Sequence, residues 1–326
     1  MAIDPDINPD INPDINPDIN PDINPNLVPG PAPPSREKRR GDRLGRRLWD
    51  DPTARLALMV LGILILAIAL GPLLYPSSPS AIDFGRAFQP PTWAHPLGTN
   101  DLGQDQLARL LVGGRISLAV GLAATLVGMS LGVSMGAVAG FCGGWVDSTL
   151  MRLTDLFLAL PQLPLVLLVV YLFGDPVRRA VGPERGIFLL VVLVIGGLNW
   201  MAVARLVRAG FLSLKQRTFV QSAVALGASP WRVVNNHLLP NILGPVIVAA
   251  TLGVGNALLA ESTLSFLGVG FPPDVPTWGR MLFDAQNYIE SAPYLVLGPG
   301  LAIFLTILCI NTLGDRLRDR LDPRSR

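Results

Sequence analysis

Residues 116–140 read ISLAVGLAATLVGMSLGVSMGAVAG, and this stretch decides the fold. It contains no charged side chain and is longer than the roughly 20 apolar residues that a helix needs to cross a bilayer. Gly128, Gly132, Gly136 and Gly140 recur every fourth residue and therefore lie on one face of such a helix. Small residues on one face let another helix approach closely. We expect a membrane-spanning helix that packs along its glycines.

Similar apolar stretches occur on both sides of this one. Two prolines, Pro161 and Pro164, interrupt one of them and predict a kink there. The further predicted spans are Leu56–Tyr75, Leu156–Phe173, Ile187–Ala204, Ile242–Leu259 and Leu295–Leu313. The sequence thus predicts an all-α integral membrane protein with about six transmembrane helices.

The composition supports a membrane protein and excludes several kinds of function. Of the 326 residues, 50% are hydrophobic and 15% are charged, against about 25% charged in soluble domains. Two cysteines and two histidines cannot build a disulfide framework or a multi-histidine metal site. Neither lysine, Lys38 or Lys215, lies in a phosphate-binding GxxxxGK[ST] loop. We therefore expect no catalytic, cofactor-binding or metal-binding residue in this chain.

The N-terminal part of the chain differs from the rest. Residues 6–25 repeat Asp-Ile-Asn-Pro, and a proline at every fourth position prevents a regular helix or a central strand. We expect a disordered tail over residues 1–35. An expanded repeat without a function is favoured over a segment that binds a partner. A basic juxtamembrane segment over residues 36–55 follows it. Such a segment is typical of the cytoplasmic side of a membrane span, and nucleic-acid binding is disfavoured.

The distribution of basic residues predicts the orientation of the chain. With six spans and the N-terminus inside, 19 of the 26 Lys and Arg side chains fall on the inner side. Basic residues concentrate in cytoplasmic loops, so both termini are expected there. The predicted transmembrane domain then covers residues 56–313, and residues 314–326 form a short cytoplasmic tail.

The long inner loop over residues 213–241 is predicted to form two short helices. The first runs from Thr218, a possible N-cap, to Leu226, and Gly227 suits the turn that ends it. Ser229 and Pro230 suit the start of a second helix, which Pro240 is expected to end. A helix–turn–helix at the membrane surface is suited to docking into a groove on another protein.

This loop resembles the coupling loop of ABC-importer permeases, known for its Glu-Ala-Ala pattern followed by Gly and Leu-Pro. Here Gln221 stands in place of the Glu and Ser222 in place of the first Ala. The residues that the resemblance assigns to ATPase coupling are Gln221, Ser222, Ala223, Gly227, Ala228, Arg232, His237, Leu239 and Pro240.

The resemblance extends to the second, C-type permease of dipeptide, oligopeptide and nickel importers. His95–Asp105 is similar to that family's outer-loop pattern HPLGTDxxGRD, from which Asn100 and Gln104 depart. Further ordered matches are Gly140–Asp147, Met151–Asp155, Arg205–Arg208, Glu261–Gly268, Pro276–Gly279 and Asn311–Pro323.

The resemblance implies the architecture of a type I ABC-importer permease in the inner (plasma) membrane. It implies a second homologous permease, two cytoplasmic P-loop ATPases that hold ATP and Mg²⁺, and an external substrate-binding protein. Peptide cargo is the expected substrate, with nickel chelates or other small solutes as an alternative. A channel or secondary carrier without ATPases is a further alternative, which usually needs ionisable groups inside the membrane.

On the outer side, the position of one ionisable residue within the fifth span and the resemblance together indicate residues for contact with other molecules. Glu261 is a possible outer gate or substrate contact, with an interfacial carboxylate as the competing interpretation. The loops that carry His95, Gly98, Asp105 and Trp278 are expected to face the binding protein.

Overall fold

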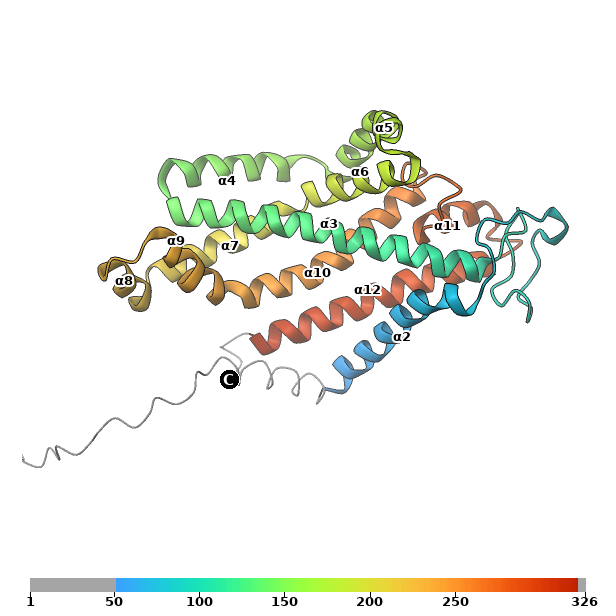
Figure 1. Cartoon of the computed structure of the whole chain (residues 1–326), viewed down its shortest axis with the longest axis horizontal. Coiled ribbons are helices and arrows are strands. Elements are labelled where there is room, and N and C mark those ends of the chain that lie inside the picture. The colour runs from blue at the N-terminus through green and yellow to red at the C-terminus, as the bar shows by residue number, and fades with distance from the viewer. Residues whose placement is uncertain (1–50, 322–326) are drawn as a thin grey trace, which may run out of the picture. The chain divides into compact units, whose positions relative to one another are not determined.

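The computed structural model describes residues 51–321, which form helices joined by turns, with no β-strand in this range (Figure 1). The predicted tail over residues 1–35, most of the basic segment and residues 322–326 lie outside the described residues. The longer helices are α2 (Pro52–Leu74), α3 (Gln106–Cys142), α4 (Gly144–Ala159), α5 (Gln162–Val181), α6 (Pro183–Gly197), α7 (Trp200–Lys215), α10 (Leu239–Phe266) and α12 (Tyr294–Leu321). The shorter ones are η1 (Phe84–Arg86), α8 (Thr218–Ala225), α9 (Pro230–Arg232), η2 (Val233–Leu238), α11 (Trp278–Ala285) and η3 (Gln286–Tyr288).

Five helical segments in this range are long and apolar enough to cross a membrane, and the bent pair α4–α5 makes a sixth if it is counted as one span. Three of them are the single helices α2, α3 and α12. The other two are compound, since Pro183–Lys215 contains α6 and α7, and Pro230–Phe266 contains α9, η2 and α10. The prediction of an all-α membrane protein with about six spans is confirmed.

Two predicted spans are less regular than the sequence indicated. The stretch Leu156–Phe173 is not one kinked helix, because α4 and α5 meet at 87°. Leu160 is extended there (φ −77°, ψ 137°), as expected for the residue before Pro161. The stretch Ile187–Ala204 crosses the break between α6 and α7, where Gln162 of α5 donates its amide to the free carbonyl of Leu198 at 3.1 Å.

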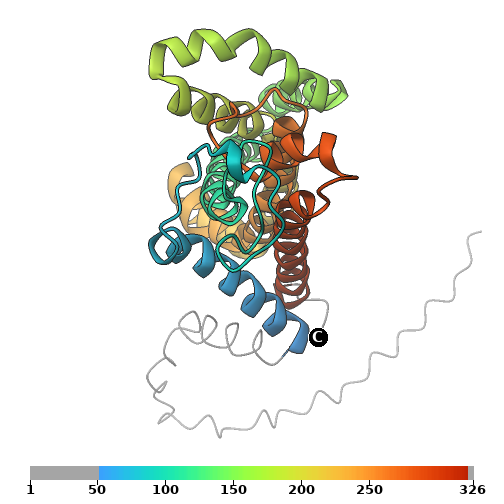
Figure 2. The same cartoon turned by 90° about the vertical axis from the view of Figure 1, so that its right-hand side faces the viewer.

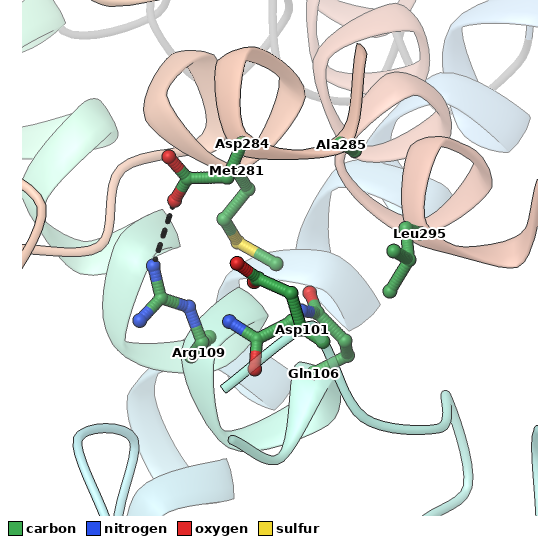
Figure 3. A pocket seen from close by; sticks show the side chains of 8 residues that line it. Asp101, Gln106, Arg109, Met281, Asp284, Ala285 and Leu295 are labelled. Atoms are coloured by element: carbon green, nitrogen blue, oxygen red, sulfur yellow. Dashed lines mark hydrogen bonds and ion pairs between the residues drawn. The ribbon is translucent and has the colours of Figure 1, made fainter. Parts of the chain in front are cut away.

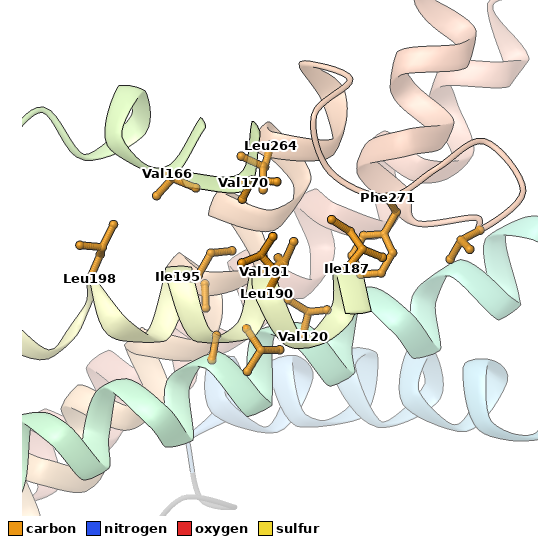
Figure 4. Packing of buried hydrophobic residues seen from close by; sticks show 14 residues of the cluster. Val120, Val166, Val170, Ile187, Leu190, Val191, Ile195, Leu198, Leu264 and Phe271 are labelled. Carbon is orange, nitrogen blue, oxygen red and sulfur yellow. The ribbon is translucent and has the colours of Figure 1, made fainter. Parts of the chain in front are cut away.

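Helix α3 lies at the centre of the bundle and packs along α6 and α7 on its glycine face. A Cβ on Gly136 would lie closer than 3.0 Å to the carbonyl oxygen of Ala204, and one on Gly140 would lie 2.6 Å from Cβ of Phe211. The expected close packing on the glycines is therefore confirmed. Beside them, Val120 of α3 lies in one apolar cluster with Ile187 of α6 (Figure 4).

The bundle has two distinct ends. One end, here called the loop end, carries α8, α9 and η2 (Figure 1). The start of α2 and the end of α12 are tied together by Arg316 and Asp51 at 3.3 Å. The other end, here called the α11 end, carries the loop over residues 75–105 and α11. Viewed toward that end, α5 and α2 lie on opposite sides of the bundle (Figure 2).

Candidate functional site

The turn after α8 is built by Gly227. Its φ is +83°, a left-handed conformation that favours glycine. The N–H of Gly227 donates to the carbonyl of Val224 at 2.9 Å, and the N–H of Ala228 donates to that of Ala223 at 3.0 Å. This pair of bonds is a Schellman motif, which ends a helix and redirects the chain. The predicted helix-ending turn at Gly227 is confirmed.

The helix starts in this loop differ in part from the prediction. Thr218 is the first residue of α8 and not its N-cap, a position that Arg217 occupies without a side-chain bond. Ser229 and Pro230 do occupy the N-cap and first positions of α9, although the hydroxyl of Ser229 makes no capping bond.

Pro240 does not end the second helix. The helix continues into α10 through η2, a π-helical segment in which the N–H of Leu239 donates to the carbonyl of Val234. The widened turn of η2 lets the helix continue through Pro240, which has no backbone N–H to donate. Asn241 donates its side-chain amide to the carbonyl of His237 at 2.7 Å and so satisfies a group near the proline.

Four large apolar side chains in this loop are exposed to solvent. We call them the loop-end apolar face: Phe219 (44% exposed), Val224 (57%), Leu226 (89%) and Trp231 (76%). Their exposure does not reflect loose packing, because Val220, Val233 and Leu238 of the same segments are buried in one cluster with α7 and α10. The loop is therefore held firmly and presents apolar groups outward.

The residues that the sequence assigned to coupling surround this face. Gln221, Ser222 and Arg232 are exposed, and Ala223, Ala228, His237 and Leu239 are half-buried. The ring of His237 lies 6.4 Å from that of Phe219. The sequence reasoning missed Phe219, Leu226 and Trp231, although aromatic and large aliphatic residues in a loop were a usable signal.

Helix α7, which leads into the loop, is tied to α4 by two ion pairs. Arg208 donates to Asp147, with Nη2 2.7 Å from Oδ2, and Arg205 pairs with Asp155. Because α7 also packs along the glycine face of α3, a displacement of α8 would reach both α3 and α4.

At the α11 end, His95 and Asp105 lie together. Nδ1 of His95 is 2.6 Å from Oδ2 of Asp105, and the same oxygen accepts from the hydroxyl of Tyr75 at 2.6 Å. Oδ1 of Asp105 caps α3 by accepting the N–H of Ala108 at 2.8 Å. Gly98 supports the loop with φ +74°, where a Cβ would lie 2.6 Å from the carbonyl oxygen of Gln89.

The two departures from the outer-loop pattern compensate each other. Oδ1 of Asn100 accepts the backbone N–H groups of Leu102 and Gln104 at 3.2 and 2.7 Å, which an aspartate could also do. Its amide donates to Oε1 of Gln104 at 2.9 Å. A neutral Asn–Gln pair thus stands where the resembled pattern has Asp and Arg.

The hydrogen bond from Tyr75 to Asp105 joins the end of α2 to the loop over residues 75–105, and its contribution to stability can be tested by pH. Burial and the neighbouring carboxylate of Asp105 raise the pKa of Tyr75 to about 12 from an ordinary 10. A raised pKa in the folded state means that the phenol stabilises the fold below pH 10 and that this contribution is lost between pH 10 and 12. We expect Tyr75→Phe to lower the melting temperature at pH 8 and to flatten its fall between pH 10 and 12. Thermal unfolding of the purified variants over that range measures both effects, and an unchanged alkaline profile contradicts the assignment.

Near the same end, Arg109 of α3 reaches α11. Its Nη2 lies 3.2 Å from Oδ2 of Asp284 (Figure 3). Asp284 also pairs with Arg280 of α11 at 2.9 Å. Burial raises the pKa of Asp284, and the two arginines oppose that shift. The pair borders a small pocket lined by Asn100, Asp101, Gln106, Arg109, Met281, Asp284, Ala285 and Leu295.

Three of the residues that were predicted to lie in loops facing a binding protein are buried. Gly98, Asp105 and Trp278 have packing roles, so contact with an external binding protein stays a prediction for the loops they hold. Glu261 is fully buried and does not meet a solute in this conformation. In residues 51–321, no group of three or more His, Cys, Asp or Glu side chains could hold a metal ion.

Two families match the sequence, and together they cover most of it. Residues 128–326 match the family described as binding-protein-dependent transport system inner membrane component. Residues 42–91 match the N-terminal TM domain of oligopeptide transport permease C.

Individual relatives agree with these matches. The chain is 36% identical to a dipeptide transport system permease protein of Alkalihalophilus pseudofirmus, over 86% of this chain and 88% of the relative. It is 39% identical to an oligopeptide transport system permease protein of Escherichia coli K12, over 86% and 93%. It is also 38% identical to a glutathione transport system permease protein of Pectobacterium atrosepticum, over 74% and 77%.

Proposed function

Because the chain belongs to the family of binding-protein-dependent transport system inner membrane components, we propose that it is one permease subunit of an ATP-driven importer of short peptides. In this proposal, an external binding protein delivers the peptide, a second homologous permease completes the path, and two cytoplasmic ATPases bind ATP and Mg²⁺. The chain itself has a transport role and catalyses no reaction.

The loop-end apolar face is the observation that carries the ATPase part of the proposal. Helix–loop segments that expose Leu226 and Trp231 on a firmly packed base are suited to fill a groove on a partner. The sequence has no phosphate-binding loop of its own, so ATP hydrolysis must come from such a partner. Motion of the docked loop would pass through α7 to α3 along the glycines and to α4 along the ion pairs.

Peptide cargo is supported by the relatives. The three described above are named for dipeptide, oligopeptide and glutathione transport, and all three cargoes contain peptide bonds. The candidate spans contain few charged side chains, which suits a path that does not select side chains strongly. Selectivity would then lie mainly in the binding protein.

The positions of the basic residues support an orientation with both termini in the cytoplasm. Lys215, Arg217 and Arg232 lie in or beside the loop, and Arg316, Arg318 and Arg320 lie at the end of α12. Basic side chains concentrate on the cytoplasmic side of a membrane protein. The α11 end would then face the outside.

Gentle purification of the C-terminally tagged chain tests the assembly. We expect a second permease and two ATPases to co-purify, and the complex to hydrolyse ATP faster when the peptide-loaded binding protein is added. A chain that purifies alone, or as an oligomer of identical subunits, would contradict the proposal and favour a channel or secondary carrier.

A further inference from the structure

The side chain of Glu261 lies inside a cage of hydroxyl groups contributed by three parts of the chain. It has no exposed surface. Its oxygens accept hydrogen bonds from Ser265 at 2.8 Å, from Ser117 at 3.1 Å and from Ser262 at 3.5 Å, and Thr277 supplies a fourth hydroxyl. Within residues 51–321, no arginine, lysine or histidine forms an ion pair with it. An ionisable side chain held inside a membrane protein calls for a functional explanation.

Two of these hydroxyls also accept hydrogen bonds from the first turn of α11. The N–H of Trp278 donates to Oγ of Ser117 at 3.2 Å, and the N–H of Arg280 donates to Oγ1 of Thr277 at 3.2 Å. A hydroxyl has a single proton, which is left free for Glu261 when its oxygen accepts an N–H. The carboxylate is therefore connected to the N-terminus of α11 through two hydroxyl groups. That end of a helix carries partial positive charge, which a carboxylate stabilises.

The surrounding packing leaves α11 little freedom to shift. A Cβ on Gly279 would overlap the backbone of Ser262, and Nε1 of Trp278 donates to the carbonyl of Leu110 at 3.0 Å. Helix α11 has only 8 residues, too few to be stable in isolation. Its position must therefore come from tertiary contacts, among which the Glu261 cage joins α3, α10 and α11.

We propose that Glu261 is a positioning residue that fixes the start of α11 against α3 and α10, so that the three helices move as one unit. The attachment itself follows from the geometry. Its meaning for transport, that α11 is a fixed part of the outer mouth and not a lid, rests on the proposed function. In this arrangement Glu261 acts through the hydroxyls and does not touch the cargo.

Maleimide labelling of one introduced cysteine tests the attachment. Ala285 of α11 is 3% exposed and lines the small pocket, so Ala285→Cys reports the separation of α11 from the bundle. The exposed Cys142 is replaced by Ser, and the buried Cys309 of α12 is kept as an internal reference. The full chain in isolated membranes is treated with N-ethylmaleimide, and mass spectrometry follows each cysteine separately.

We expect Glu261→Gln to speed the labelling of the introduced cysteine about tenfold. The NH2 group of the glutamine side chain is a hydrogen-bond donor and would face hydroxyl groups that donate to the carboxylate, so these bonds would be lost. Labelling of Cys309 stays slow. The control Glu290→Gln, which neutralises an exposed carboxylate in the connection from α11 to α12, leaves both rates unchanged. If Glu261→Gln is not recovered in membranes, Ser117→Ala is used instead, because it removes only the link from Glu261 to the N–H of Trp278. It is expected to speed the labelling of the cysteine introduced at Ala285 and not that of Cys309.

Two results would overturn the inference. One is unchanged labelling of the introduced cysteine in a recovered Glu261→Gln protein, or in Ser117→Ala if the first is not recovered. The other is faster labelling of this site and of Cys309 alike, which would mean a general loosening of the bundle. Neither readout requires transport, so a failure here is distinct from a failure of the proposed import function.

Discussion

Replacement of Gly136 by Leu is expected to prevent α3 from packing on α7 and to cause the largest loss of stability of any single change considered. A Cβ at this position would lie closer than 3.0 Å to the carbonyl oxygen of Ala204 and to Cβ of Val207, and 3.0 Å from Cα of Ala204. Backbone atoms cannot rotate away as a flexible side chain can, so the two helices must separate. Overpacking of a core costs about 1 to 3 kcal/mol, and the contacts with backbone atoms place this change at the upper end of that range.

Thermal unfolding of the purified permease measures this loss. A loss of that size corresponds to a fall of about 5 to 10 °C in the melting temperature. The matched control is Gly62→Leu, because Gly62 also lies within a span, in α2, and a Cβ there has no neighbour within 4 Å. A Gly136→Leu protein as stable as the Gly62→Leu control would show that α3 and α7 are not packed as described.

Replacement of Gly227 by Glu is expected to abolish most transport while the protein still inserts and folds. The position has no neighbour within 4 Å, so the side chain itself fits. A non-glycine residue at φ +83° costs about 1 to 2 kcal/mol, which a packed bundle can absorb. The carboxylate, however, stands next to Leu226 on the face proposed to dock into the ATPase, where it would be buried without a partner.

The measurement is peptide uptake alongside the amount of ATPase that co-purifies with the tagged chain. A docking loss of about 1.4 kcal/mol already lowers binding tenfold, so uptake should fall by about that factor or more. Gly227→Asn is the matched control, since asparagine accepts the left-handed conformation without adding charge, and it should retain most uptake. Normal uptake with Gly227→Glu would remove the coupling role of this turn.

Much of the fold could be predicted because bilayer thickness and helix periodicity act on the sequence directly. The apolar residues 116–140 predicted a span, which the length and hydropathy of α3 confirm. Their glycines predicted its packing face, which contacts to Ala204 and Phe211 confirm. The turn at Gly227 was equally readable, because a glycine directly after a helical segment favours the left-handed turn that ends a helix. These features depend on residues close in sequence.

The sequence did not predict features that depend on partners far along the chain. The local effect of Pro161 is to interrupt a helix, but the 87° angle between α4 and α5 is set by packing of α5 on α6. Pro240 was expected to stop a helix, and η2 lets that helix continue because the widened turn matches the missing N–H. The burial of Trp278 and Asp105 likewise depends on α3 meeting the loops at the α11 end.

The sequence by itself therefore determined the class of protein, the approximate number of spans, the close-packed face of α3 and the place of the turn at Gly227. Each follows from hydrophobicity, glycine spacing or turn chemistry within a short segment. Only the tertiary structure decided that Glu261 is enclosed and not exposed to cargo. Its hydroxyl partners Ser117 and Thr277 lie on other segments, and only folding brings donors so far apart in the chain around one carboxylate.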